Sequence, residues 1–394
     1  MQNQSIVIVG MARTPMGGLQ GSLSPLTASE LGAVAMAAAV ERAGIDAASV
    51  DEVIMGCVLP AGQGQAPARQ ASLKAGLPLA TGCTTLNKMC GSGMKAVMLA
   101  HDLLLAGSAK VMVAGGMESM SNAPYLIPKA RGGLRLGHGE LKDHMFLDGL
   151  EDAYDKGKLM GVFAELCAER FGFSRAAQDE FALSSLARAV AAIESGAFAG
   201  EIAAVKLPGR SGETVVDTDE QPLKARPDKI PSLKPAFKPD GTVTAANASS
   251  ISDGAAALVL MSEDEARARG LTPLARIVGH STFAQEPSWF TTAPVGAMRQ
   301  LFAKIGWQPG DVDLFEINEA FAVVTMAAMQ ELGLPHDKVN VNGGACALGH
   351  PIGASGARIL VTLIAALQRR GGKKGVASLC IGGGEATALA LELV

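Results

Sequence analysis

The sequence predicts an α/β protein built from two similar halves, with a further segment inserted in the middle of the chain. Three observations lead to this prediction. Short apolar runs alternate with helical segments, a set of short motifs occurs twice, and a charged stretch interrupts the pattern near the centre. With 394 residues, of which 48% are hydrophobic, the chain is long enough for two or three domains and a large core.

The first half shows the alternation of strands and helices. Apolar runs and Gly or Ala content predict the following elements in order: a strand over Ser5–Val9, a helix over Leu31–Ala43 that Gly44 ends, a strand over Val53–Met55, a helix over Gly91–Leu105 and a strand over Val111–Ala114. Strands that alternate with helices indicate a mostly parallel sheet that is covered by helices.

The same order of motifs returns in the C-terminal part. Gly306 and Val312, ahead of a predicted strand over Leu314–Ile317, follow Gly44 and Val50 at the same offset of 262 residues. Two more pairs match in order: Ser92-Gly93 with Ser355-Gly356, and Gly115-Gly116-Met117-Glu118 with Gly382-Gly383-Gly384-Glu385. These matches indicate a duplicated α/β half.

The middle of the chain departs from this pattern. Residues 121–248 hold most of the charge clusters and a stretch rich in Pro and Lys, so we expect an inserted, loop-rich domain. The apolar run Gly254–Met261 is then expected to rejoin the first sheet. The predicted boundaries are an N-terminal half over residues 1–120, the insertion over 121–248, a return to the first half over 249–271 and a C-terminal half over 272–394.

Composition excludes several classes of function. The formal net charge of -4 predicts no general attraction to nucleic acid or to an anionic membrane, and 4% aromatic residues argue against a base-stacking surface. No apolar run approaches the roughly 20 residues that cross a bilayer, and Ile6–Val9 is too short for a signal peptide. We therefore expect a cytoplasmic protein.

The six cysteines are scattered and contain no CxxC pair, which favours neither a disulfide framework nor a zinc site. Cys90 differs from the others because it precedes a predicted helix. There the helix dipole and unpaired N–H groups are expected to lower its pKa, although a structural cysteine at a tight helix start is the alternative. The spacing of Gly91, Gly93 and Ala96 resembles a dinucleotide loop. However, no clear strand leads into it and no ribose-binding acid follows in register, so a nicotinamide dehydrogenase is disfavoured.

Three more residues are candidates for chemistry. His350, between Gly349 and Pro351, is predicted on a rigid exposed turn and suits acid–base work, with an ordinary hydrogen-bonded loop histidine as the alternative. Cys380 ends an apolar run ahead of three glycines, whose N–H groups could form an oxyanion hole; simple packing is its alternative. Asn318 follows a strand, where its amide could hold a water molecule or cap the next helix.

Taken together and in order, these segments resemble the thiolase family over essentially the whole chain. The segments that carry the resemblance are Arg13-Thr14-Pro15, Asn87 to Gly93, Gly115 to Ser121, Asn318-Glu319-Ala320-Phe321, Gly349-His350-Pro351 and Cys380 to Gly384. The resemblance implies the thiolase fold, in which two duplicated βαβαβ-type halves form a layered αβαβα core with an inserted loop domain. It also implies a place in fatty acid metabolism.

The resemblance implies an acetyl-CoA C-acetyltransferase that condenses two acyl-CoA molecules, or cleaves a 3-ketoacyl-CoA, through an acyl group on Cys90. In this scheme His350 helps to form the Cys90 thiolate, and Cys380 removes a proton from the second acetyl-CoA. His350 and a water held by Asn318 stabilise the enolate, while the N–H groups of Cys90 and Gly382 stabilise the acyl oxyanion. The scheme requires no metal and no redox cofactor, and coenzyme A thioesters are its substrates.

Family resemblance also places coenzyme A and the partners. The pantetheine arm is expected along Met160, Ala245, Ser249, Ala320 and Phe321, with Phe237 nearby. The basic residues Lys224, Arg226 and Lys229 are candidates for phosphate contacts, or are simply a solvated surface. A homotetramer, arranged as a dimer of dimers, is expected.

One position departs from the family pattern. Leu159, in Lys158-Leu159-Met160-Gly161, stands where biosynthetic short-chain thiolases commonly have His, so the acyl chain length stays open. Two other functions also stay open: a decarboxylating 3-ketoacyl synthase, which usually has two site histidines, and a non-catalytic thiolase-like scaffold.

Overall fold

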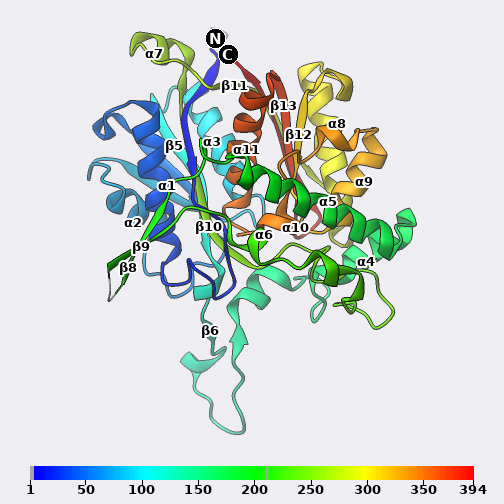
Figure 1. Ribbon diagram of the computed structural model, residues 1–394. Coiled ribbons are helices and arrows are strands. Elements are labelled where there is room, and N and C mark those ends of the chain that lie inside the picture. Colours follow the sequence, from blue (N-terminus) through cyan, green and yellow to red (C-terminus); the bar gives the residue numbers. More distant parts are fainter. Residues whose placement is uncertain (1–3, 210–211) are drawn as a thin grey trace.

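The computed structural model describes residues 4–209 and 212–394 (Figure 1). Within these residues, ten strands form one mixed sheet in the order β12-β13-β14-β11-β1-β10-β5-β3-β4, with β2 paired to β10. The strands are β1 (Ile6–Arg13), β2 (Gly17–Gly18), β3 (Glu52–Gly56), β4 (Gly82–Leu86), β5 (Val111–Ser119), β10 (Ser252–Ser262), β11 (Ala275–Ala284), β12 (Leu314–Ile317), β13 (Lys374–Ile381) and β14 (Glu385–Leu393).

The sheet consists of two halves with the same strand order and directions. In the N-terminal half β3 is parallel to β5, β5 is antiparallel to β10, and β10 is antiparallel to β1. In the C-terminal half β12, β13, β14 and β11 repeat these relations in the same order. A short antiparallel pairing of β1 with β11 joins the halves, at Val7↔Arg276 and Ile8↔Ala275. The predicted duplication is thus visible in the strand pairing itself. The expectation of a mostly parallel sheet was wrong, because among the described strands of this sheet only the pairs β3–β4, β3–β5 and β12–β13 are parallel.

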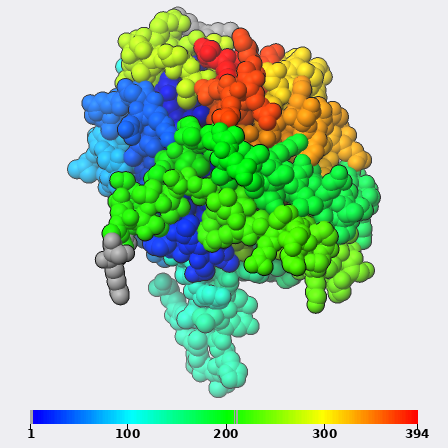
Figure 2. Space-filling model, viewed as in Figure 1, coloured from blue at the N-terminus to red at the C-terminus, as the bar shows by residue number. Residues whose placement is uncertain are grey.

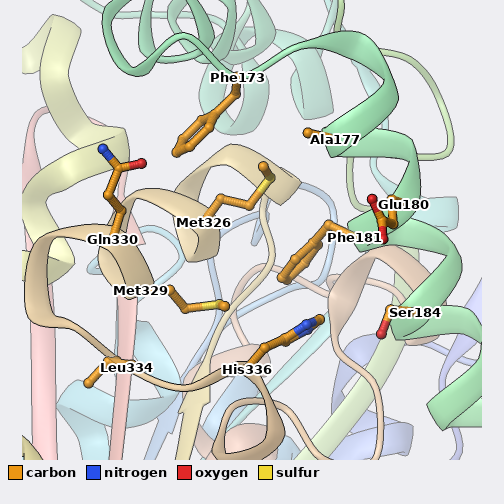
Figure 3. A pocket seen from close by; sticks show the side chains of 10 residues that line it. All are labelled: Phe173, Ala177, Glu180, Phe181, Ser184, Met326, Met329, Gln330, Leu334 and His336. Atoms are coloured by element: carbon orange, nitrogen blue, oxygen red, sulfur yellow. The ribbon is translucent and has the colours of Figure 1, made fainter.

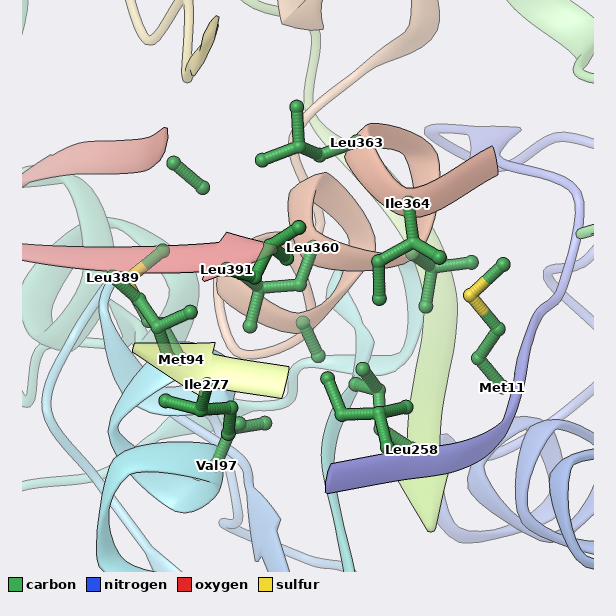
Figure 4. Packing of buried hydrophobic residues seen from close by; sticks show 14 of the residues in the cluster. Met11, Met94, Val97, Leu258, Ile277, Leu360, Leu363, Ile364, Leu389 and Leu391 are labelled. Carbon is green, nitrogen blue, oxygen red and sulfur yellow. The ribbon is translucent and has the colours of Figure 1, made fainter. Parts of the chain in front are cut away.

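Helices form three layers around the two half-sheets. Helices α1 (Ala28–Ala43) and α2 (Pro67–Lys74) pack on the outer face of the N-terminal half, and α8 (Ala293–Ile305) and α9 (Ala322–Leu332) pack on that of the C-terminal half. Helices α3 (Ser92–Leu105) and α11 (Ser355–Arg370) lie in between and share one apolar cluster with strands of both halves (Figure 4). The result is the layered αβαβα core that was expected.

Alternation along the strands builds these layers. In β10, which is buried along its whole length, Leu258 and Leu260 face the central cluster, whereas Ala257 and Val259 face α1. Strands buried on both faces read as continuous apolar runs, which is why the run at Gly254–Met261 could be recognised as a strand.

The predicted elements recur with small shifts at their ends. The helix predicted over Leu31–Ala43 is α1, which begins with a capping box at Thr27 and ends at Gly44 with φ +67°. The strand predicted over Leu314–Ile317 is β12. One expectation was wrong: a strand, β4, does lead toward Cys90. It is a partly exposed strand with the sequence Gly-Cys-Thr-Thr-Leu, so it lacks the apolar run that reveals a buried strand.

The segment over residues 121–248 contains more helix than the expected loops. It includes α4 (Met160–Phe171), α5 (Arg175–Glu194) and α6 (Glu220–Lys224), the hairpin of β8 (Val205–Gly209) and β9 (Gly212–Val216), and a small hairpin of β6 (Tyr125–Leu126) and β7 (Lys142–Asp143). The part between β6 and β7 projects from the body as an arm (Figures 1 and 2). Two further short helices, α7 (Glu263–Ala268) and α10 (Ala345–Leu348), lie later in the chain.

A buried ion-pair network ties the insertion to the first strand. The guanidinium of Arg13, at the end of β1, bonds the carboxylates of Glu201 (2.5 Å) and Asp219 (2.7 and 2.9 Å), and all three side chains are buried. Removing one partner of such a group leaves an uncompensated buried charge, so this network fixes how the insertion sits on the core.

In the part of the chain that the structure describes, no helix is both long and apolar enough to cross a membrane.

Candidate active site

Cys90 lies on a tight turn between β4 and α3. The preceding residue, Met89, has φ +46°, which is a left-handed conformation that non-glycine residues seldom adopt. Ser92 fixes the turn: its Oγ accepts the N–H of Lys88 (2.8 Å) and donates to the carbonyl of Met89 (2.6 Å). The turn therefore presents the half-buried Cys90 side chain just before the first turn of α3.

Close packing around this turn leaves no room for side chains on two neighbouring residues. A Cβ on Gly91 would lie 2.4 Å from Cδ1 of Ile381, and a Cβ on Gly93 would lie 2.7 Å from the backbone nitrogen of Ala357. The two glycines thus let the turn approach the end of β13 and the start of α11. This close approach brings Cys90 to the part of the chain that carries Cys380.

Two backbone N–H groups point at the sulfur of Cys90. They belong to Gly382 and to Cys90 itself, and both favour the thiolate, since they act to lower the pKa of Cys90. Cys380, at the end of β13, is close enough that a charge on Cys90 raises its pKa. Cys380 is only 1% exposed, so this sulfur lies beneath the surface of the site. The structure therefore brings the thiol and N–H of Cys90 close to the thiol of Cys380 and the N–H of Gly382, which lie almost 300 residues later in the sequence.

Burial sets the pKa values of both thiols. It raises the pKa of Cys90 to about 11, although the two N–H donors act in the opposite direction, and the charge of Glu118 raises it further. The pKa of Cys380 is raised well above its ordinary value by burial and then by Cys90. The expectation that the helix dipole lowers the pKa of Cys90 was thus wrong, because loss of hydration outweighs it. Both thiols are protonated near neutral pH and need a base.

His350 lies in the loop between α10 and α11, after Gly349 with φ +104°. The expectation of an exposed turn was wrong, because the residue is only 6% exposed. Its Nδ1 is 2.5 Å from Oγ of Ser355, and that hydroxyl donates to the carbonyl of Pro351 at 2.9 Å. Since the hydroxyl proton is already used, Nδ1 carries a hydrogen and donates it, which leaves the lone pair on Nε2.

The remaining ring nitrogen of His350 is available for chemistry. Nε2 is buried and has no hydrogen-bond partner among the described residues. Burial, and then the positive charge of Arg358, lower the pKa of His350 to about 3, so the ring is neutral. Ile352, two residues further on, packs in one apolar cluster with Met89 and Cys90. A neutral imidazole with a free Nε2, in a loop that packs against the Cys90 turn, is suited to act as a general base.

Glu118 holds the His350 loop against the N-terminal half. Its buried carboxylate accepts the N–H groups of Val58 (2.9 Å), Leu59 (3.1 Å) and Gly353 (2.9 Å). Burial raises the pKa of Glu118 to about 7 against these donors. Sequence reasoning found the segment around Glu118 only as a motif. The sequence feature that could have identified Glu118 is its position at the end of an apolar strand. A carboxylate at such a position is buried and must find hydrogen-bond partners inside the fold.

Asn318 follows β12 and is 1% exposed. Neither its Oδ1 nor its Nδ2 has a hydrogen-bond partner among the described residues. The alternative role as a helix cap was wrong, because α9 begins at Ala322 after Phe321 and has no side-chain cap. The adjacent Glu319 anchors the segment by accepting from Ser185 Oγ (2.7 Å) and Asn340 Nδ2 (2.8 Å). A buried amide without partners is suited to bind a polar ligand or a water molecule.

An ion pair connects the two segments that provide the N–H groups. Lys88 lies two residues before Cys90, and Glu385 directly follows the glycine run that contains Gly382. The Lys88 ammonium and the Glu385 carboxylate form a partly buried salt bridge. No local sequence pattern indicates this contact, since 297 residues separate its partners.

The residues predicted to hold coenzyme A fall into two adjoining groups. Lys224, Lys229 and Ala245 line a surface hollow of about 260 Å³ together with Arg226. Both lysines are exposed and pair with neighbouring carboxylates, Lys224 with Glu220 and Lys229 with Asp228. The same hollow is lined by Ser250, whose carbonyl accepts the N–H of His350 at 3.1 Å. The hollow therefore extends toward His350.

The second group surrounds Cys380. Met160, Phe237, Ala320 and Phe321 share an apolar cluster with Cys380, and the rings of Phe237 and Phe321 pack edge to face at 6.0 Å. The N–H of Ser249 donates to the carbonyl of Ala320 at 3.0 Å. Four of the predicted residues thus pack around Cys380, Ser249 is bonded to one of them, and Ala245 lines the surface hollow.

A larger hollow, of about 440 Å³, lies elsewhere between α5 and α9. Figure 3 shows Phe181 and His336 next to each other in its lining, with Met326 and Met329 beside them. The two rings stack at 5.2 Å between centroids. None of the predicted site residues lines this hollow, so a large cavity by itself does not identify the site.

Comparison with known proteins agrees with the geometry. Residues 6–264 match the family model described as "Thiolase, N-terminal domain", and residues 271–393 match "Thiolase, C-terminal domain". Acetyl-CoA acetyltransferase 2 of Arabidopsis thaliana is 54% identical over 395 residues, covering 99% of this chain and 98% of that protein. Acetyl-CoA acetyltransferase of Pseudomonas aeruginosa is 52% identical over 390 residues, covering 98% and 99%.

A solved structure shows the same fold. The crystal structure of the Bacillus anthracis acetyl-CoA acetyltransferase superposes with a TM-score of 0.96 and covers 99% of each chain at 44% sequence identity. The match extends over both halves and the insertion. The family that the sequence motifs indicated is therefore confirmed.

Proposed function

Because this chain belongs to the thiolase family, we propose that it is an acyltransferase that condenses two acyl-CoA molecules to a 3-ketoacyl-CoA and CoA, and catalyses the reverse thiolysis. Acetyl-CoA is the proposed donor, since the similar proteins are named acetyl-CoA acetyltransferases. One observation carries the proposal: the N–H groups of Cys90 and Gly382 favour the thiolate of Cys90, and this thiol lies near enough to a second thiol, Cys380, for its charge to raise the pKa of Cys380.

Acylation comes first in the proposed scheme. Nε2 of His350 takes the proton of the Cys90 thiol, and the thiolate attacks the carbonyl carbon of an acyl-CoA. The oxyanion of the tetrahedral intermediate accepts hydrogen bonds from the N–H groups of Cys90 and Gly382. The C–S bond to CoA then breaks, and the departing thiolate takes the proton of Cys380. The enzyme now holds an acyl group on Cys90, a proton on His350 and a thiolate at Cys380.

Condensation follows on the second substrate. The Cys380 thiolate removes a proton from the α-carbon of acetyl-CoA, for which its raised pKa makes it a strong base. The enolate oxygen is held by Nε2–H of His350 and by a water bound to Asn318, a role supported by the unpartnered amide. The enolate carbon attacks the acyl group. Breakdown of the intermediate releases the 3-ketoacyl-CoA and the Cys90 thiolate, which recovers its proton from His350.

Two substitutions test the scheme. Cys90→Ala is expected to abolish acyl transfer, because no other group can carry the acyl intermediate. Cys380→Ser is expected to keep acylation of Cys90, seen by intact mass as one added acetyl group, while condensation stops. Normal turnover by Cys90→Ala would disprove the proposal.

A decarboxylating synthase or a non-catalytic scaffold receives no support from a site with Asn318, Cys380 and an intact Cys90.

Several finer points are part of the proposal. Lys224, Arg226 and Lys229 are proposed to contact the phosphates of coenzyme A. The apolar cluster that contains Phe237 and Phe321 is proposed to contact the pantetheine arm. The reaction is proposed to use groups of the chain alone, without a cofactor. A reducing compartment such as the cytoplasm, and a place in fatty acid metabolism, suit a site that depends on free thiols.

We also propose a homotetramer. The projecting arm between β6 and β7 carries large exposed apolar side chains, among them Leu136, which is 99% exposed, and Leu134 and Leu141. Such side chains on a projecting arm favour contact with other subunits. Light scattering of the purified protein should give four chains per particle, and Leu134→Ser/Leu136→Ser should give a smaller particle.

A further inference from the structure

Two histidines and an aspartate from opposite halves of the molecule meet near the surface. His101 and Asp102 lie on α3, and His280 lies on β11. Oδ1 of Asp102 is 3.0 Å from Nδ1 of His101 and 2.9 Å from Nε2 of His280. We propose that this cluster binds one divalent transition-metal cation of the Zn²⁺ class, in a site that is separate from the thiols. His101 is nine residues beyond Ser92, where α3 begins, which places it about 14 Å along the helix axis from the Cys90 turn.

A β-bulge directs His280 into the cluster. The pairing of β11 with β14 shifts between Ile277 and Gly279, so that Ile277 pairs with Leu391 and His280 pairs with Leu389. Leu389, Leu391 and Ile277 all face the central apolar cluster. His280 therefore points to the same face as Ile277, toward α3, whereas uninterrupted alternation would have pointed it toward α8. Bulges commonly redirect a side chain in this way at functional positions.

The imidazole of His101 is held by packing as well. Val97, one helical turn before His101, packs in the central cluster with Ile277, and Figure 4 shows these two side chains close together. The side chains of His101 and His280 are only 12% and 11% exposed. Both imidazoles are thus fixed by packing, and a site needs little rearrangement to form around them.

The donor set and its geometry fit a cation of this class. Two imidazole nitrogens and one carboxylate oxygen are ligands that zinc, cobalt and nickel accept. All three donor atoms lie within 4.8 Å of one another, while ligands of a tetrahedral Zn²⁺ are roughly 3.3 Å apart. Asp102 is 51% exposed, which leaves the solvent side open for water as a further ligand. Without a cation, Nδ1 of His101 and Nε2 of His280 each form a hydrogen bond with Asp102. The experiment below distinguishes this hydrogen-bonded cluster from a cation-bound one.

Cobalt binding to the full-length chain tests the proposal. Equilibrium dialysis with Co²⁺ is expected to give saturable binding of one ion per chain, with the visible absorption of a low-coordinate Co²⁺ site. His101→Asn and His280→Asn should each weaken binding at least about tenfold. His138→Asn, which removes an exposed histidine on the projecting arm, is the matched control and should leave binding unchanged. The cation should also raise the thermal midpoint of the wild type but not of His280→Asn.

Three results would overturn the site. One is the absence of saturable binding to the wild type, and another is unchanged binding by both His101→Asn and His280→Asn. The third is an intense near-ultraviolet band, which would show that Co²⁺ binds thiolates instead. Circular dichroism verifies that each variant is folded, and if one single variant does not fold, the other decides. None of these readouts depends on catalysis, so the test stands apart from the proposed function.

Discussion

The two halves of the molecule share one strand order but supply different chemical groups. In the N-terminal half, the turn before α3 carries Cys90, two residues ahead of Ser92. At the matching place in the C-terminal half, two residues ahead of Ser355, stands Gly353, whose N–H donates to Glu118. Gene duplication explains the common scaffold, and the segments that follow the strands decide what each half contributes.

The corresponding strands β5 and β13 differ in the same way. β5 continues through Glu118, whose carboxylate accepts hydrogen bonds from backbone N–H groups of both halves and so connects them. β13 reaches Cys380 and Ile381 and then turns into three glycines, where Gly382 has its N–H free to face Cys90. One half thus supplies the nucleophile and a brace, and the other supplies the two bases. The following predictions test this division, from the largest expected effect to the smallest.

The first prediction concerns the base from the C-terminal half. His350→Ala should lower kcat/KM for thiolysis by about 10²- to 10⁴-fold, since a positioned general base contributes this much. With the base removed, the pKa of Cys90, about 11, controls its reactivity. Alkylation of Cys90 by iodoacetamide in this variant should therefore become faster by about tenfold per pH unit from 8 to 10, without a plateau. A plateau near pH 7 would show that burial does not govern this thiol.

The second prediction separates the two oxyanion sites. Asn318→Ala should slow condensation by about 10²-fold, because it removes one donor of the enolate site, yet leave the rate of Cys90 acylation almost unchanged. Single-turnover acylation, followed by intact mass, and steady-state condensation measure the two steps. Asn122→Ala, at a polar contact with Ser24 and Leu26, serves as the control. Equal losses in both steps would assign Asn318 a structural role instead.

The third prediction tests the salt bridge between the halves. Lys88→Met should lower kcat/KM by about tenfold, because the Cys90 and Gly382 segments lose a contact that aligns their N–H groups. If the pair acts as a unit, Lys88→Met/Glu385→Gln should be no worse than the poorer single variant. The exposed Lys110→Met provides a matched control. Additive losses in the double variant would mean that the two residues act independently.

The smallest effect is expected at Ser355. Ser355→Ala removes the acceptor that keeps the hydrogen of His350 on Nδ1, so part of the imidazole adopts the wrong tautomer. We expect kcat to fall by several-fold to about tenfold with KM almost unchanged. Ser355→Thr keeps the hydroxyl and should restore most of the rate. A loss that Thr does not restore would point to packing beside α11 rather than to the tautomer.

Much of this protein was predictable from the sequence. The duplicated half, most strands, the helix of Cys90 and the family itself follow from apolar runs and motif order, because these are local patterns. Residue type, together with the neighbouring glycines or strands, indicates the candidates Cys90, His350, Cys380 and Asn318. Errors arose where the pattern was weak, as in the polar strand β4, or where exposure had to be guessed, as for His350.

Only the tertiary structure determined how these residues behave. Burial, which depends on packing between distant segments, raises the pKa of Cys90 and lowers that of His350, against the local effect of a helix end. The fold also brings Lys88 and Glu385 together as a salt bridge. The fold also places His280 next to His101 and Asp102. The sequence spacing does not predict this cluster, because 178 residues separate His280 from Asp102 and a β-bulge sets the direction of His280. The sequence determined which groups are present, and the fold determined their neighbours and their hydration.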